Sequence, residues 1–192
     1  MLKTTNERAA RNSLQTPVFA GGVVYNPQTT EQFSCAEPSG DAYTYRIDAH
    51  AKAHVVRCAP AGEKVVVPEL LGGCTVVGFD EGSFASLMKV KHVLCPSGLQ
   101  TISDRAFGGC LRLESIALND GLRYVGSEAF SLCTELQEIA LPESVESVGA
   151  HLTGSGSSTW SARPARVLVS PESEFLFFDE ADSFLRDRSG AM

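Results

Sequence analysis

The 192-residue sequence lacks several features that would assign it to a common functional class. No apolar run approaches the roughly 18–20 residues that span a bilayer, and the apolar stretch at 18–24 is short and broken by glycine. We therefore predict neither membrane insertion nor a signal peptide. Bases are also scarce, since 16 Lys and Arg face 23 Asp and Glu, for a net charge of −7. Nucleic-acid binders need a basic surface to neutralise phosphate, so DNA or RNA is not an expected partner.

Motifs for metal, cofactor or catalytic chemistry are missing as well. The six cysteines form no Cys-x-x-Cys pair of the kind that builds a zinc site. His50 and His54 have the i, i+4 spacing of a helical metal pair, but their segment resembles a hairpin connection and offers no third ligand. The glycine-rich stretches lack the Lys-Ser/Thr that completes a phosphate-binding loop. We expect no metal, no cofactor and no enzymatic activity.

The sequence contains instead a repeat of 23 residues. Phe84, Phe107 and Phe130 share this spacing, and each follows a small residue. Five further apolar columns keep the register: Val90, Leu113 and Leu136; Val93, Ile116 and Ile139; Cys95, Leu118 and Leu141; Leu99, Leu122 and Val145; Ile102, Val125 and Val148. One unit alone is too small to bury these side chains. The spacing therefore predicts stacked units with one continuous core.

Each unit is predicted to contain a short strand, a turn and a second apolar pair. The pattern Leu-x-x-Ile-x-Leu, seen at 113–118 and 136–141, ends in the alternation typical of a strand. Turn-forming residues such as those at 119–121 follow it. We expect the Ala-Phe dipeptide farther on to lie on a short helical or 3₁₀ turn. The predicted fold class is an α/β repeat solenoid.

These units resemble the BspA-like, or treponemal-type, leucine-rich repeats. The matching segments are 136–144 (LQEIALPES), 124–130 (YVGSEAF) and Cys133, and the resemblance extends over residues 65–149. It implies a leucine-rich repeat array whose short strands lie on the concave face. It also implies a non-catalytic bacterial protein, at the cell surface or secreted, that adheres to protein or glycan ligands. The alternative is an intracellular structural or interaction scaffold in the cytoplasm, because no leader is recognised and several cysteines resemble reduced core residues.

We expect four segments along the chain. Residues 1–39, rich in polar residues and without periodicity, are predicted to be a mobile N-terminal tail. Residues 40–64 are predicted to form a small β-hairpin or meander that caps the open end of the array. Three to four repeats follow at 65–150, the first lengthened by the insertion at 71–74. An irregular last repeat and closing segment occupy 151–192, and 166–169 is predicted to be its strand.

The outward side chains of the repeat strands are the candidate binding surface. On the expected concave side they are Lys91, His92, Leu94, Glu114, Ser115, Gln137 and Glu138. Solenoids commonly bind ligands on this side, and a mixture of small apolar and charged residues suits a protein ligand. A strand face that is merely solvated would have the same composition, so both interpretations stay open at the level of sequence.

The repeat register also predicts the state of three cysteines. Cys110 and Cys133 share a column with Leu87, and Cys95 occupies the position of a strand leucine. Substitution by leucine indicates a buried apolar site, which suits a free thiol. Cys35, Cys58 and Cys74 lie outside the register, and a disulfide between Cys58 and Cys74 remains conceivable.

Overall fold

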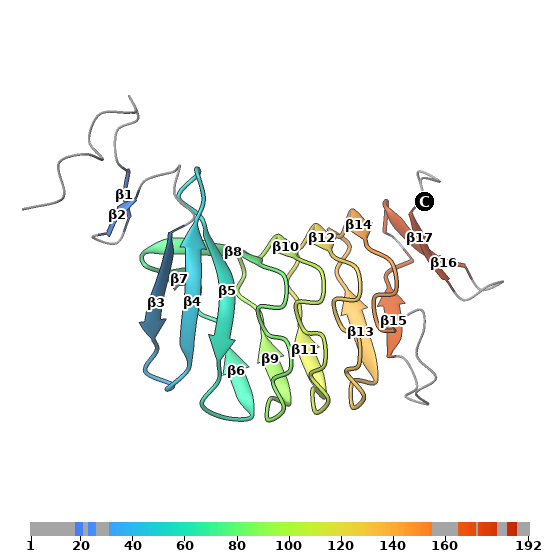
Figure 1. The fold of residues 1–192 in the computed structure, drawn as a ribbon. Helices are drawn as coiled ribbons and strands as arrows, with labels where there is room; N and C mark the ends of the chain where they lie inside the picture. The colour runs from blue at the N-terminus through green and yellow to red at the C-terminus, as the bar shows by residue number, and fades with distance from the viewer. Residues whose placement is uncertain are drawn as a thin grey trace, which may run out of the picture.

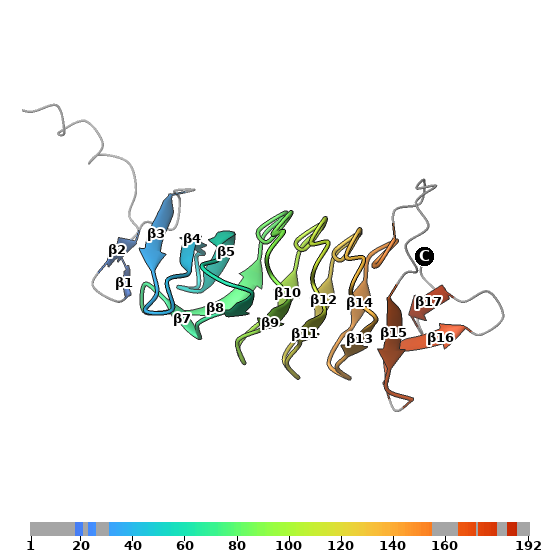
Figure 2. The same ribbon diagram turned by 90° about the horizontal axis from the view of Figure 1, so that it is seen from below.

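A computed structural model shows a solenoid of strands and turns (Figures 1 and 2). It describes residues 18–20, 23–25, 31–154, 165–171, 173–179 and 184–187, and these contain seventeen strands and no helix. Two rows of parallel strands run along the array, one on each side of a shared core. A row of tight turns closes the third side of every coil.

The first strand row includes the predicted Leu-x-x-Ile-x-Leu segments, which form β11 (Ser115–Ala117) and β13 (Glu138–Leu141). Its other members are β6 (Lys64–Val66), β9 (His92–Leu94) and β15 (Arg166–Val169). Figure 1 shows all of these strands side by side. Parallel pairing places Val65, Val93 and Ile116 in one inward column, and β13 pairs with β15 in the same way. The predicted strand at 166–169 is therefore confirmed.

The second strand row comes from the second apolar pair of each unit. It consists of β8 (Cys74–Phe79), β10 (Thr101–Ile102), β12 (Tyr124–Val125) and β14 (Ser147–Val148). All are parallel, with Phe79, Ile102, Val125 and Val148 in one register. Each coil thus contributes a strand to both sides of the core.

The expected helical or 3₁₀ turn at the Ala-Phe position is wrong, and so is the α/β class, for the residues described. Left-handed φ values recur four residues apart in each turn, at Arg105 and Gly109 and again at Glu128 and Leu132. Such residues interrupt a right-handed helix. In addition, alternate N–H groups bond to the next coil, as Phe107 does to the Ala129 carbonyl at 2.8 Å. These groups are therefore not available for bonds within a helix.

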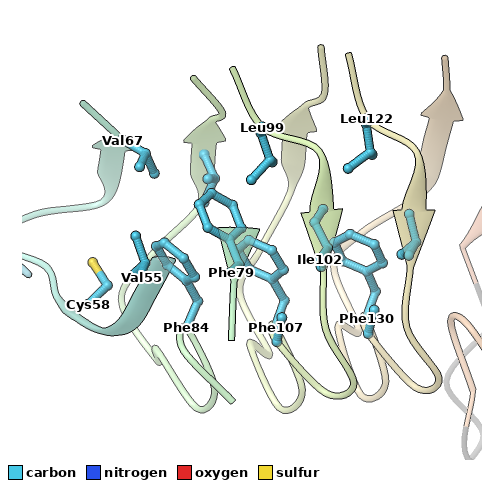
Figure 3. Packing of buried hydrophobic residues seen from close by; sticks show 14 of the residues in the cluster. Val55, Cys58, Val67, Phe79, Phe84, Leu99, Ile102, Phe107, Leu122 and Phe130 are labelled. Carbon is cyan, nitrogen blue, oxygen red and sulfur yellow. The ribbon is translucent and has the colours of Figure 1, made fainter. Parts of the chain in front are cut away.

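A column of phenylalanines fills the core beside these turns (Figure 3). Phe84, Phe107 and Phe130 are at most 1% exposed. Adjacent rings stack with centroids 4.8 Å and 5.3 Å apart and interplanar angles of 17° and 9°. Coil stacking sets this spacing, because neighbouring strands lie about 4.8 Å apart. The 23-residue repeat thus places Phe84, Phe107 and Phe130 in one continuous stack, which we call the aromatic spine.

The N-terminal cap differs from the predicted one in its strands. β3 (Gln32–Ala36), β4 (Ala42–Ile47) and β5 (Ala53–Ala59) form an antiparallel meander. The cap thus begins within residues 1–39, the segment expected to be a mobile tail. Residues 32–36 alternate between exposed and partly buried side chains, a pattern that suits an edge strand. β6 is the first strand of the array, where it pairs with β9. Of residues 1–30, the structure describes only the hairpin of β1 (Val18–Ala20) and β2 (Val23–Tyr25).

The cap and the array share one sheet. β5 pairs with β4 on one side in antiparallel fashion and with β8 on the other in parallel. The guanidinium of Arg46, on β4, donates two hydrogen bonds to the Asp80 carboxylate, at 2.6 Å and 2.8 Å. The insertion at 71–74 folds into a hairpin of β7 (Leu70–Leu71) with β8, and its turn packs against Tyr45, since a Cβ on Gly72 would lie 2.4 Å from the Tyr45 hydroxyl. The cap therefore covers the first coil directly.

At the far end of the array lies a further hairpin. β16 (Leu176–Asp179) pairs antiparallel with β17 (Phe184–Asp187) beyond β15 (Figure 2). Leu176 is 2% exposed and belongs to the common core. Residues 155–164 and 188–192, which belong to the expected irregular last repeat and closing segment, lie outside the described residues.

Ser83 breaks the pattern of the column that precedes each phenylalanine. Ala106 and Ala129 fill this column in the next coils, whereas the Ser83 hydroxyl is buried without a hydrogen-bond partner. A buried unsatisfied hydroxyl costs about 1–3 kcal/mol. We therefore expect Ser83→Ala to raise the free energy of unfolding by about 1 kcal/mol in urea titration. A loss of stability would contradict this assignment, and Ser131→Ala, in another column, is a reference substitution.

Candidate functional site

The seven residues predicted as a binding surface come together on one face of the protein. We call this surface, formed by the outward side chains of β6, β9, β11, β13 and β15 and by the residue before each strand, the strand-row face. His92, Leu94, Ser115 and Glu138 lie on the strands, while Lys91, Glu114 and Gln137 immediately precede them. Six are exposed or half-exposed, and the side chain of Lys91 retains 24% exposure. The face corresponds to the side that the sequence predicts to be concave.

Polar side chains on this face contact the neighbouring coil. The Ser115 hydroxyl lies 2.9 Å from Nδ1 of His92, which the parallel register places directly beside it. Ion pairs join Lys91 to Glu63 at 3.0 Å and Arg166 to Glu138 at 3.3 Å. Exposed pairs of this kind contribute little to stability, typically 0–1 kcal/mol. Their main effect is to fix the direction of the outward side chains.

The Ser115–His92 pair does not have the geometry of an activated nucleophile. A catalytic dyad needs the histidine oriented by a hydrogen bond from its second nitrogen to an acidic group. Here Nε2 lies 4.0 Å from the Glu114 carboxylate, beyond hydrogen-bond distance, and the imidazole is 45% exposed. We therefore assign this pair to the surface and not to catalysis.

The sequence analysis found only part of a column of exposed aliphatic residues, since it named Leu94 but not the end members Val66 and Leu168. Val66, Leu94 and Leu168 are 53%, 37% and 43% exposed, and the exposed methyl groups of Ala117 and Ala140 lie between them in the same register. The 23-residue spacing alone did not reveal the column. The first and last intervals are 28 residues long, because insertions lengthen those two coils.

The histidines considered as a metal pair do not share a site. His50 lies in the exposed turn between β4 and β5, while His54 on β5 faces Asp48 at 3.2 Å and Asp80 at 3.7 Å. Within the described residues, no three His, Cys, Asp or Glu side chains converge as a metal site would require. Nor does this part of the chain contain a helix long and apolar enough to cross a bilayer.

The cysteine thiols are structural. Cys110 and Cys133 are buried, as predicted, and donate hydrogen bonds to the carbonyls of Phe84 and Phe107 in the preceding coil. Cys95 is partly buried against the core. All six cysteines are free, so the Cys58–Cys74 disulfide that the sequence left open is not formed. Burial raises the pKa of Cys110 to about 11 and that of Cys133 to about 12.

These pKa values predict an alkaline loss of stability. An unfolded thiol, with a pKa of 9.0, ionises before the buried thiols, with pKa values of about 11 to 12. The folded state then holds more protons, so the free energy of unfolding falls as the pH rises from about 9 towards 12. Urea titrations across this range measure the slope. Replacing Cys110 and Cys133 by alanine should flatten it, and an unchanged slope in that variant would contradict the assignment.

Comparisons with known proteins support the repeat assignment. A family model described as "BspA type Leucine rich repeat region (6 copies)" matches residues 73–156. A leucine-rich repeat protein from Bacteroides capillosus is 23% identical, with a TM-score of 0.58 over 71% of this chain and 97% of that one. No curated protein matches the chain.

Two longer solved structures share the fold. A leucine-rich repeat protein from Bacteroides ovatus has 23% identity and a TM-score of 0.52, and the match covers 66% of this chain and 36% of that one. A leucine rich cell surface protein from Faecalibacterium prausnitzii has 17% identity and a TM-score of 0.51, with coverages of 71% and 42%. Identities this low show the fold alone. The family model shows that residues 73–156 form a BspA-type leucine-rich repeat region, and the solved structures show that the chain has the leucine-rich repeat fold.

Proposed function

We propose that this protein is a non-catalytic binding module that acts at a bacterial cell surface or after secretion and adheres to a protein or glycan ligand. The observation that carries the proposal is the strand-row face. Five parallel strands present the seven predicted residues and an exposed aliphatic column on one continuous surface. Exposed aliphatic side chains that line up in this way are characteristic of interaction surfaces.

The cellular location in this proposal is suggested by a structural relative. The protein from Faecalibacterium prausnitzii, which shares the fold, is described as a cell surface protein. A surface location would expose the strand-row face to ligands outside the cell.

A second candidate function is an intracellular interaction scaffold, and the cysteines favour it. All six thiols are free. Proteins in oxidising compartments tend to convert cysteines to disulfides, whereas the cytoplasm keeps them reduced. Both candidates use the same face for binding and differ in the compartment.

Reversing two charges on the strand-row face should weaken ligand binding. Glu114 and Glu138 have side chains 48% and 55% exposed, so Glu114→Lys with Glu138→Lys changes the surface with little effect on the core. We expect the labelled wild-type protein to bind specific members of an array of proteins and glycans, and the double variant to lose at least about tenfold in affinity, the equivalent of 1.4 kcal/mol.

The control for this experiment reverses charges elsewhere. Glu81→Lys with Glu146→Lys makes the same change in net charge away from the strand-row face and should leave binding intact. The thermal midpoint of each variant must match the wild type. Normal binding by the Glu114/Glu138 variant would exclude the strand-row face as the ligand site.

A further inference from the structure

The aliphatic column runs through the centre of the strand-row face and crosses all five strands. Strand pairing aligns Val66, Leu94 and Ala117 in one set and Ala140 with Leu168 in another, and each follows a residue that is buried in the core or packs against it. Strands about 4.8 Å apart give the column a length of roughly 19 Å. Its large side chains stand towards the ends and two alanines lie in the middle. The column therefore offers apolar contact area to an elongated partner.

One margin of the column is acidic. The residue three positions after each aliphatic residue begins the turn that follows the strand, and in three of the five coils it is an acid: Glu69, Asp120 and Glu143, all exposed. The other two members are Ser97 and Pro171. The carboxylates of Glu69 and Glu143 accept hydrogen bonds from the next coil, which hold them in place. In the described residues this margin has no base.

The opposite margin is mixed in charge. Lys64, Lys91 and Arg166 lie there together with Glu63, Glu114 and Glu138. The ion pairs of Lys91 with Glu63 and of Arg166 with Glu138 partly neutralise these charges. Unpaired negative charge is thus concentrated on one side of the column. A partner that complements the face needs positive charge on that side.

This asymmetry argues against two other occupants. A second copy of the chain in a symmetric face-to-face dimer would bring the negatively charged face against itself, and like charges oppose such an interface. An anionic membrane surface would be repelled by the same carboxylates.

We propose that the ligand of the strand-row face is a protein segment whose aliphatic side chains are bordered on one side by lysine or arginine. This inference rests on the proposed function and specifies its partner. Aliphatic contacts with Val66, Leu94 and Leu168 supply affinity, while Glu69, Asp120 and Glu143 set the orientation by pairing with the basic border. Because these charges are exposed, association should weaken as salt rises.

A pair of synthetic peptides tests the partner chemistry. Both are 15 residues long with leucine every three to four positions; one carries lysine at the positions along one side of the leucines, and its twin carries glutamate there. Binding to the full chain is measured by fluorescence anisotropy at low and at high salt. We expect saturable binding of the lysine peptide that weakens with salt, and at least about tenfold weaker binding of the glutamate twin.

Variants of the chain locate the site. Leu94→Gln with Leu168→Gln removes the aliphatic contacts, and Asp120→Lys with Glu143→Lys reverses the acidic margin. Each double variant should bind the lysine peptide with an affinity at least about tenfold lower than that of the wild type. Tyr124→Gln is a matched control, because Tyr124 is 39% exposed but lies on the second strand row. Glu81→Lys with Glu146→Lys controls for net charge, and neither control should alter binding.

The possible outcomes separate this inference from the proposed function. If the glutamate twin binds equally or better and its binding depends on Leu94 and Leu168, the strand-row face is a binding surface but the basic partner is wrong. If neither peptide binds, the inference of a basic aliphatic partner is also wrong. The binding experiment with proteins and glycans still decides the proposed function. If the lysine peptide binds and the aliphatic variant binds it unchanged, the inferred site is wrong.

Discussion

Phe107→Ala is expected to lower the free energy of unfolding by about 3–5 kcal/mol, the usual cost of a large cavity left by a buried phenylalanine. Phe107 is fully buried and lies between two stacked rings, those of Phe84 and Phe130. It also contacts Phe79 of the second strand row, with ring centroids 6.0 Å apart. Removal of the ring interrupts the aromatic spine at its centre and leaves a cavity between Phe84 and Phe130.

Urea denaturation followed by circular dichroism measures this loss. Leu132→Ala is the control, because Leu132 lies in the same row of turns but is 43% exposed and should cost much less. A loss below about 1 kcal/mol for Phe107→Ala would be that of an ordinary surface substitution. It would contradict a continuous core built on the phenylalanine column.

Gly126→Ala is expected to destabilise the array by about 3 kcal/mol, at the upper end of the cost of overpacking. A Cβ at Gly126 would lie 2.4 Å from the backbone nitrogen of Asp104 in the preceding coil and 2.4 Å from its carboxylate oxygen Oδ1. The side chain can rotate away, but the backbone cannot move without separating the two coils. Gly149 meets the nitrogen of Ser127 at 2.3 Å in the same way, so close contact between coils recurs in this column.

Gly62→Ala provides the comparison for this effect. A Cβ at Gly62 meets nothing within 4 Å, so this substitution should be neutral or stabilising by less than about 1 kcal/mol. Thermal and urea unfolding of the two variants give the difference directly. Equal stability of Gly126→Ala and Gly62→Ala would show that the coils are not in close contact at this glycine.

The core of the array was predictable because periodicity identifies buried columns without any knowledge of backbone geometry. Phe107, Leu113, Ile102 and Leu122 fall in apolar columns of the sequence, and all are fully buried in the structure. The same columns placed Cys110 and Cys133 in the core. A substitution pattern across repeats reports burial directly, since each copy samples the same environment.

The second strand row and the turns could not be predicted in this way. β10 and β12 are two residues long, too short for an alternation of inward and outward residues to be recognised. Two of the left-handed positions hold Arg105 and Glu128. Glycine at these positions would have indicated the left-handed conformation from the sequence, but arginine and glutamate do not. These residues adopt that conformation because bonds to neighbouring coils fix the turn, such as that from the Arg105 nitrogen to the Ser127 carbonyl at 3.0 Å. Tertiary contacts here override local preference.

The candidate site was found in part. Outward positions within the 23-residue register identified His92, Ser115 and Glu138, and parallel pairing places them beside the same positions of the other coils. Val66 and Leu168 were missed because the insertions in their coils shift them out of that register. The aliphatic column and its acidic margin become visible only when the strand pairing of β6 and β15 is known.

The most direct test of the proposed binding role outside the cell is the location of the protein. Intact producing cells are treated with an external protease, and the chain is followed with a specific antibody beside a cytosolic marker. Loss of the antibody signal while the marker survives is the predicted result, and it would leave the strand-row face accessible to ligands in the medium. Full protection of the chain, with recovery in the soluble lysate, would contradict the surface proposal and favour the internal scaffold.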